Sequence, residues 1–144
     1  MTVVDASLAT KLLIKESDSE DARRWFGGQS EPVLAPDLLA IEVAQAVVRR
    51  VNARDVAAVR GRDILRTWRV ILENDGIMLL RTSAAQVEKA AGLAISLGHP
   101  TKDCVYLALA IERNTNLMTC DAKFAARARE IYPGVKLLSD NAAD

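Results

Sequence analysis

The chain has 144 residues and a formal net charge of zero, with 19 lysines and arginines against 19 aspartates and glutamates. Half of the residues are hydrophobic, which is typical of a soluble globular protein, and the length predicts one domain spanning residues 1–144. The zero balance excludes a uniformly basic nucleic-acid binder, so any electrostatic partner must be recognised by a local patch.

Local features exclude several other classes of protein. No apolar run approaches the ~20 residues of a membrane span, and Asp5 interrupts the apolar start, so we expect neither a membrane segment nor a signal peptide. The two cysteines, Cys104 and Cys120, form no Cys-x-x-Cys pair, and His99 is the only histidine, which argues against a Cys/His zinc site. The expected location is a reducing cytoplasm.

Short β-branched runs alternate with longer helical patterns along the chain. The first half predicts strands at residues 2–4, 32–35 and 77–80, and helices at 6–14, 18–26, 37–52 and 55–73. Asp55 is the expected cap of the last of these helices, and Gly61 is its expected weak point. The second half predicts helices from the cap Ser83 to near Gly98, at 101–113 and at 122–131, with strands at 116–120 and 135–138.

This alternation predicts the fold class. Strands that are continuous apolar runs separated by helices indicate a mostly parallel sheet covered on both faces. We therefore expect an α/β fold, a three-layer α/β/α sandwich. Sites in such sheets form beyond the carboxyl ends of the strands, where the strand order reverses.

Four carboxylates stand out against this pattern. Asp5 and Asp121 directly follow apolar strands, Glu42 lies on the apolar stripe of a helix, and Asp103 lies on the apolar stripe of another. Each has a simpler explanation. The strand-end aspartates could be helix N-caps, Asp103 could complement a helix dipole, and Glu42 could be partly exposed or paired with an arginine.

Convergence of these acids would indicate a metal site. Carboxylates held together raise one another's pKa, and a hard divalent cation such as Mg²⁺ or Mn²⁺ relieves the repulsion. Such a cation supports hydrolysis of a phosphodiester. The sequence alone does not show that the acids converge.

Four segments carry a resemblance to a known family. They are VVDAS at residues 3–7, APDLLAIEVA at 35–44, TKDCVYLALA at 101–110 and LMTCD at 117–121. Together they span nearly the whole chain, which resembles a PIN domain, specifically the VapC-type toxin ribonucleases of type II toxin–antitoxin pairs.

The resemblance implies a mechanism and a site. Asp5, Glu42, Asp103 and Asp121 match the acidic quartet that binds Mg²⁺ or Mn²⁺ and catalyses attack of water on an RNA phosphodiester in this family. We expect Asp5 and Asp121 to be direct ligands, and Glu42 and Asp103 to ligate directly or through water. The implied activity is endonucleolytic cleavage of RNA, often at particular tRNA or rRNA sites, although the sequence does not predict the target.

Residues beside the acids have weaker assignments. Thr119 matches a hydroxyl that commonly supports the last acid, and Ser7 matches a small polar position near the first. We interpret His99 as a loop residue without a catalytic role, and Cys104 and Cys120 as small buried packing residues.

An arginine-rich segment is a candidate RNA surface. Residues 49–69 carry seven arginines against two aspartates, a local net charge of +5. Arg62, Arg66 and Arg69 fall on one helical face, which suits phosphate oxygens. A solvated helix exterior is the alternative.

Protein partners are implied by the resemblance rather than by composition. Trp25 and Phe26 either pack in the core or help to form a protein-binding groove. In the resembled family a cognate antitoxin covers that helical region, and the toxin forms a homodimer.

Alternatives from other classes remain. The main one is a catalytically inactive PIN-like module that binds RNA or protein, although the complete acidic quartet argues against it. A response-regulator receiver would have paired acids where this chain has Asp5-Ala6, and a haloacid-dehalogenase-type phosphatase would have an aspartate in place of Ser7. A Rossmann enzyme would have a glycine-rich first turn, which the sequence lacks.

Overall fold

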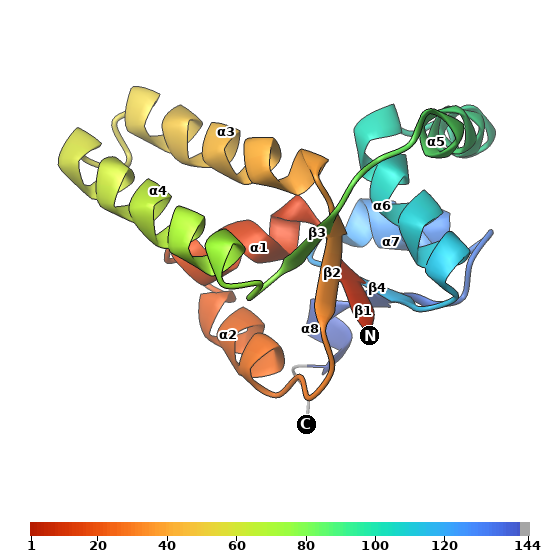
Figure 1. The fold of residues 1–144 in the computed structure, drawn as a ribbon, viewed down its shortest axis with the longest axis horizontal. Coiled ribbons are helices and arrows are strands. Elements are labelled where there is room, and N and C mark those ends of the chain that lie inside the picture. Colours follow the sequence, from red (N-terminus) through yellow and green to blue (C-terminus); the bar gives the residue numbers. More distant parts are fainter. Residues whose placement is uncertain (142–144) are drawn as a thin grey trace.

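Five parallel strands form one sheet in the computed structural model, which describes residues 1–141 (Figure 1). Their order across the sheet is β3-β2-β1-β4-β5, and each neighbouring pair is parallel. The strands are β1 (Thr2–Val4), β2 (Val33–Pro36), β3 (Met78–Leu80), β4 (Asn116–Thr119) and β5 (Val135–Leu137). The predicted parallel sheet is confirmed.

The central strands are apolar on both faces because helices cover both sides of the sheet. Val3 and Val4 of β1 are fully buried, as is Leu117 of β4. In the register, Val3 lies between Leu34 of β2 and Leu117. Continuous apolar runs are the expected pattern for such strands.

The helices complete a three-layer arrangement. They are α1 (Ala6–Leu13), α2 (Ser19–Gly27), α3 (Leu38–Asn52), α4 (Ala58–Glu73), α5 (Ala84–Leu97), α6 (Thr101–Arg113), α7 (Ala122–Ala128) and α8 (Leu138–Asn141). Helices α1 to α4 lie on one side of the sheet and α5 to α7 on the other (Figure 1), which confirms the predicted α/β sandwich. No helix in residues 1–141 is long and apolar enough to cross a bilayer.

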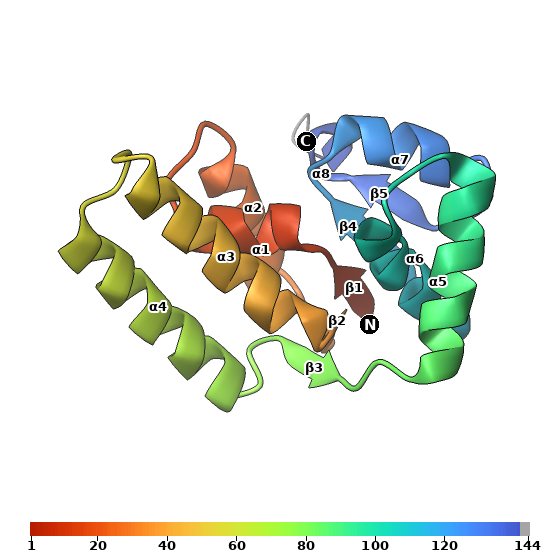
Figure 2. The same ribbon diagram turned by 90° about the horizontal axis from the view of Figure 1, so that it is seen from above.

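Helices α3 and α4 form a hairpin that extends away from the sheet (Figure 2). They approach closely at Gly61, which is buried. A Cβ added at this position would overlap Cγ2 of Val51, so only glycine allows this approach without a shift of the neighbouring side chain. Low helix propensity makes Gly61 a weak point in isolation, but in the folded chain it permits the packing of the two helices.

Several predicted boundaries differ from the structure by one to three residues. Helix α4 begins at Ala58 rather than at Asp55, because residues 53–57 form a turn in which Arg54 has a φ of 64° and the N–H groups of Asp55 and Val56 both donate to Arg50 O. Helix α7 ends at Ala128 rather than at 131, shortly before Pro133, which disfavours helical backbone in the preceding residue. Strand β5 ends at Leu137, and the next residue begins the short helix α8.

Candidate functional site

The strand order reverses at β1, between β2 on one side and β4 on the other. Asp5 directly follows β1, while Thr119 ends β4 and Asp121 follows it. The Asp5 N–H donates to Met118 O of β4 at 3.4 Å, so the two strand ends are joined there. This is the position at which parallel sheets bind their ligands.

Asp5 lies at the bottom of this junction and is buried. Its Oδ1 accepts from the Ser7 hydroxyl at 2.6 Å and from the Leu8 N–H at 3.2 Å. Its Oδ2 accepts from the Thr119 hydroxyl. Both carboxylate oxygens are therefore fixed, and one of the donors comes from a strand more than a hundred residues away.

Burial raises the pKa of the Asp5 carboxyl from 3.8 to about 6. The hydrogen bonds from Ser7, Thr119 and Leu8 oppose this increase, and the negative charge of Asp103 adds to it. The site thus holds a carboxylate whose charge is poorly compensated by the protein. A nearby cation would stabilise the charged form and lower this pKa.

Asp121 caps α7, with its Oδ1 accepting from the Phe124 N–H at 2.9 Å. The Asp121 N–H donates in turn to the Thr119 hydroxyl at 3.0 Å. Asp5 likewise caps α1 through Leu8. The N-cap explanation for the two strand-end acids is therefore correct, and it is compatible with a role in the site, because both caps hold their carboxylates at the strand ends.

The Thr119 hydroxyl links the two strand-end acids. It donates to the Asp5 carboxylate and accepts from the Asp121 backbone, and the Ser7 hydroxyl lies 3.2 Å from it. Ser7 also accepts from the Cys120 N–H at 2.9 Å. These two hydroxyls, that of Thr119 buried and that of Ser7 partly buried, form a bridge between the ends of β1 and β4.

Glu42 projects from α3 toward α6, where two side chains hold it. The Tyr106 hydroxyl donates to its Oε1 at 2.6 Å, and Lys102 Nζ lies 3.5 Å from its Oε2. Tyr106 is almost fully buried, and burial followed by this hydrogen bond raises the pKa of its hydroxyl. Tyr106 therefore stays protonated and donates to Glu42.

Asp103 lies in the first turn of α6 and has one close side-chain partner, His99. The Nε2 atom of His99 is 2.7 Å from Asp103 Oδ2. The imidazole itself is buried and stacks on Phe124, with ring centroids 4.8 Å apart. His99 lies in the loop between α5 and α6, as predicted, and its ring contacts the site, which the sequence did not predict.

An open cleft of ≈460 Å³ connects these groups, and we call it the acidic cleft. Glu42, Asp103 and Asp121 line it. Asp5 is buried beside the cleft and does not line it, but its hydrogen-bond partner Ser7 does. The structure therefore brings the four predicted acids to one region from four different segments of the chain.

Three cations also line the acidic cleft: Lys11, Arg49 and Lys102. Lys11 is paired with Glu16 and Asp18, and Lys102 with Glu42. Arg49 is exposed, and none of the ion pairs within residues 1–141 involves it. Its guanidinium is thus available to an anion entering the cleft.

The donor set fits a hard divalent cation, because carboxylate oxygens are the ligands that Mg²⁺ and Mn²⁺ prefer. The raised pKa of Asp5 and its repulsion by Asp103 are the local signs of uncompensated negative charge. Over residues 1–141, however, no three acid, histidine or cysteine side chains are close enough to hold one ion. The acids share the cleft, but each carboxylate has partners of its own, and those of Glu42 and Asp103 are Tyr106, Lys102 and His99.

The predicted arginine face lies elsewhere, on the exposed side of α4. Arg66 pairs with Asp63 at 2.6 Å, and Arg69 lies 3.7 Å from Glu73. Arg62 is exposed beside an apolar groove between α3 and α4. None of these three arginines lines the acidic cleft.

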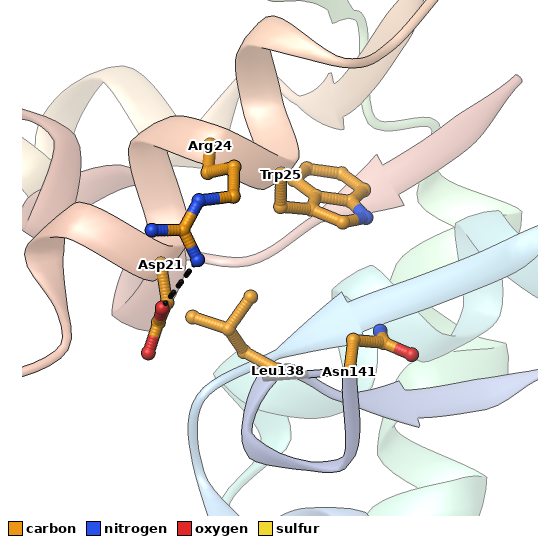
Figure 3. Close-up of a pocket in the computed structure, with 5 residues that line it drawn as sticks. All are labelled: Asp21, Arg24, Trp25, Leu138 and Asn141. Carbon is orange, nitrogen blue, oxygen red and sulfur yellow. Dashed lines mark hydrogen bonds and ion pairs between the residues drawn. The ribbon is translucent and has the colours of Figure 1, made fainter. Parts of the chain in front are cut away.

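Trp25 and Phe26 are half-buried against the core. Trp25 lines a small pocket of ≈120 Å³ between α2 and α8, opposite Leu138 and Asn141 (Figure 3). The ion pair between Asp21 and Arg24 flanks this pocket. Trp25 therefore packs partly against the core and also forms part of the wall of this pocket.

The two cysteines differ from each other. Cys104 is fully buried, as predicted, and burial raises the pKa of its thiol to about 11. Cys120 packs against the core, as predicted, but it is only partly buried and also lines the acidic cleft. Burial also raises the pKa of the Cys120 thiol to about 12, which keeps it protonated at neutral pH.

Sequence reasoning missed His99, Tyr106 and Arg49 as site residues. His99 stands four residues before Asp103, but it precedes the first residue of α6, so the helical i, i+4 spacing does not predict their contact. Tyr106 and Glu42 are 64 residues apart and lie on helices from opposite sides of the sheet, so only the tertiary fold brings them together. Arg49 was included in the arginine-rich segment, but nothing local distinguished it from the other arginines.

Comparison with known proteins agrees with this geometry. The model of the PIN domain family matches residues 2–130. No match to a curated protein sequence was found.

Similar folds occur in solved structures. The Mycobacterium tuberculosis VapC20 toxin, described as cleaving the sarcin–ricin loop, has a TM-score of 0.73 and 16% identity, covering 88% of this chain and 94% of its own. A toxin–antitoxin complex from Klebsiella pneumoniae has a TM-score of 0.71 and 15% identity, covering 96% of this chain and 98% of its own. A protein from Pyrobaculum aerophilum has a TM-score of 0.68 and 17% identity, covering 99% of this chain and 96% of its own. At these identities the likeness concerns the fold.

Proposed function

The chain belongs to the PIN domain family, and on that premise we propose that it is a toxin endoribonuclease that hydrolyses RNA phosphodiester bonds with the help of Mg²⁺ or Mn²⁺. The observation that carries the proposal is the junction of β1 and β4, where Asp5 and Asp121 are joined through Thr119 at one end of the acidic cleft. The proposed metal-holding residues are Asp5, Glu42, Asp103 and Asp121.

Each part of the cleft has a proposed task. A divalent cation bound there would supply Lewis-acid activation of water and neutralise charge on the phosphate. Ser7 and Thr119 fix the Asp5 carboxylate, and the α7 cap fixes Asp121, so these acids need little rearrangement on binding. Tyr106 and Lys102 hold Glu42 at the opposite wall.

The direct test is a cleavage assay with total RNA, followed by sequencing of the new ends. The purified protein should cleave in Mn²⁺ or Mg²⁺ and be inactive in EDTA, and Asp5→Asn or Asp121→Asn should abolish cleavage. Glu130→Gln, which changes an exposed acid after α7, is the matched control and should remain active. Full activity of the purified Asp5 and Asp121 variants would refute the proposal.

The same assay addresses the second candidate, an inactive PIN-like binding module. The observation in its favour is that Glu42 and Asp103 already have close partners of their own and that residues 1–141 hold no compact group of three ligands. Such a module would bind RNA or protein, and it would cleave nothing in any metal.

Two cationic surfaces are candidates for the RNA backbone. We propose that Arg49 contacts phosphate at the acidic cleft, and that Arg62, Arg66 and Arg69 form a second, outer contact on α4. Loss of a phosphate contact lowers the slope of log affinity against log salt by about one. Arg49→Gln should therefore reduce that slope, and the triple glutamine variant of the α4 arginines should reduce it further; an unchanged slope would remove the corresponding surface from the proposal.

Protein partners complete the proposal: a cognate antitoxin that inhibits the nuclease, and a second copy of the chain in a homodimer, with the activity located in the cytoplasm. The Klebsiella pneumoniae structure of similar fold is a toxin–antitoxin complex, which supports the first partner. Co-expression with a small protein encoded beside this chain should relieve growth arrest and give a stable complex. Light scattering of the isolated chain should give twice the 15.7 kDa monomer mass.

A further inference from the structure

His99 occupies a fixed position between α5 and α6. The preceding residue, Gly98, ends α5 with a φ of 61°, and its carbonyl accepts from Arg127 Nη1 at 2.7 Å. The His99 N–H donates to Ala94 O at 3.1 Å, and the next residue, Pro100, is the N-cap of α6. The backbone is thus held on both sides, and the imidazole has little freedom to move.

The ring itself contacts two parts of the acidic cleft. Its Nε2 lies 2.7 Å from Asp103 Oδ2, and its face stacks on Phe124 of α7 with 27° between the planes. The N–H of that same Phe124 donates to Asp121 Oδ1 at 2.9 Å. One side chain therefore touches Asp103 and packs on the residue whose backbone holds Asp121.

We propose that His99 is a positioning residue of the nuclease site: it orients the Asp103 carboxylate and fixes the start of α6 against α7, and so sets the placement of Asp103 relative to Asp121. It is not a catalytic residue, because its polar contact is to Asp103 and not to a substrate. The inference rests on the proposed function, since orientation of an acid matters most when that acid holds a cation. Side chains that orient metal-binding groups are worth 10- to 100-fold in metal affinity or activity.

Two substitutions separate the hydrogen bond from the stack. His99→Phe keeps an aromatic ring on Phe124 and removes the donor, whereas His99→Gln places an amide nitrogen near the position of Nε2 and removes the ring. The first readout is the Mn²⁺ concentration that gives half of the full rise in melting temperature, because a bound cation stabilises the folded state. The second is kcat and KM for RNA.

We expect His99→Phe to raise the half-maximal Mn²⁺ concentration by about 10-fold and to lower kcat by about 10-fold or more, with KM for RNA nearly unchanged. His99→Gln should recover part of both losses. A role in folding alone would lower the melting temperature in EDTA and leave the Mn²⁺ dependence unchanged, which would overturn the proposal. Wild-type Mn²⁺ dependence in both variants would overturn it as well.

The metal readout keeps this proposal distinct from the proposed function. If the wild-type protein cleaves no RNA but responds to Mn²⁺, the ribonuclease assignment fails and the comparison of His99→Phe with His99→Gln still decides the role of His99. If the wild-type protein shows no Mn²⁺ response, the positioning role falls. If His99→Phe fails to fold, Phe124→Leu tests the stack and His99→Gln tests the donor. Wild-type Mn²⁺ dependence in both of these variants would also overturn the positioning role.

Discussion

Asp5 and Asp121 at the strand ends are held by backbone N–H groups and by hydroxyls, whereas Glu42 and Asp103 on the helices are held by larger side chains of α6 and of the loop before it. The strand-end acids therefore take their positions from the sheet itself. The helix acids depend on side-chain contacts between separate elements: Glu42 of α3 meets Tyr106 of α6, and His99, which holds Asp103, stacks on Phe124 of α7. We infer that the first pair is the rigid half of the site and the second pair the adjustable half.

The largest expected effect separates the two pairs by activity. Asp5→Asn and Asp121→Asn should each lower the cleavage rate by about 10³-fold or more, because metal assistance contributes several kcal/mol to phosphodiester hydrolysis. Glu42→Gln and Asp103→Asn should lose less, since their ligation can pass through water. Single-turnover cleavage at saturating Mn²⁺ measures all four variants, and equal losses would remove the distinction between the pairs.

The next effect concerns stability and pH in the absence of metal. Because the folded-state pKa of Asp5 is raised from 3.8 to about 6, the folded protein binds that proton more tightly than the unfolded chain does. The protonated Asp5 carboxyl therefore stabilises the folded state fully below pH 3.8, and this stabilisation is lost as the pH rises to about 6. The loss amounts to about 3 kcal/mol of unfolding free energy. Urea unfolding in EDTA should show Asp5→Asn gaining stability relative to wild type over this range, and parallel curves would contradict the raised pKa.

Thr119 tests the bridge within the strand-end pair. Thr119→Val removes the donor to Asp5 and the acceptor for the Asp121 N–H in a fully buried position, at a cost of about 1–3 kcal/mol of unfolding free energy. Thr119→Ser keeps the hydroxyl and is the matched control. Thermal unfolding and cleavage rates should rank wild type, Ser and Val in that order, and a serine variant as impaired as the valine variant would assign the effect to packing.

The smallest effect concerns the helix acids. Tyr106→Phe removes the hydroxyl that donates to Glu42 while keeping the buried ring, which should cost about 1 kcal/mol of unfolding free energy. Glu42 keeps its ion pair with Lys102, so cleavage should fall by about 10-fold rather than disappear. An activity loss as large as that of Asp5→Asn would show that Glu42 is held as rigidly as the strand-end acids.

The same contrast explains how much the sequence could predict. The strands, the helices and the positions of Asp5 and Asp121 follow from local patterns, since an acid directly after a buried apolar run lies at the sheet edge. The partners of Glu42 and Asp103 do not follow from such patterns. Tyr106 meets Glu42 only because the folded sheet brings α6 and α3 near each other from its opposite sides, and His99 reaches Asp103 after Gly98 turns the chain before α6.

The boundaries show a related limit. Asp55 is a good cap by residue type, yet the N–H groups of Asp55 and Val56 are already used in the turn that follows α3, and α4 begins at Ala58. Gly61 has poor helix propensity, yet it is the residue that lets α4 lie against Val51. In both cases tertiary contacts outweigh the local preference.

The pairing of β1 with β4 has a consequence for synthesis of the chain. Asp5 is made 114 residues before the Thr119 hydroxyl that holds it, a delay on the order of 10 s at ribosomal rates. During that time β1 can pair with β2, but the edge of β1 that pairs with β4 in the folded protein stays unpaired. The hydroxyl bridge that holds Asp5 next to Asp121 therefore forms only after Thr119 has been made.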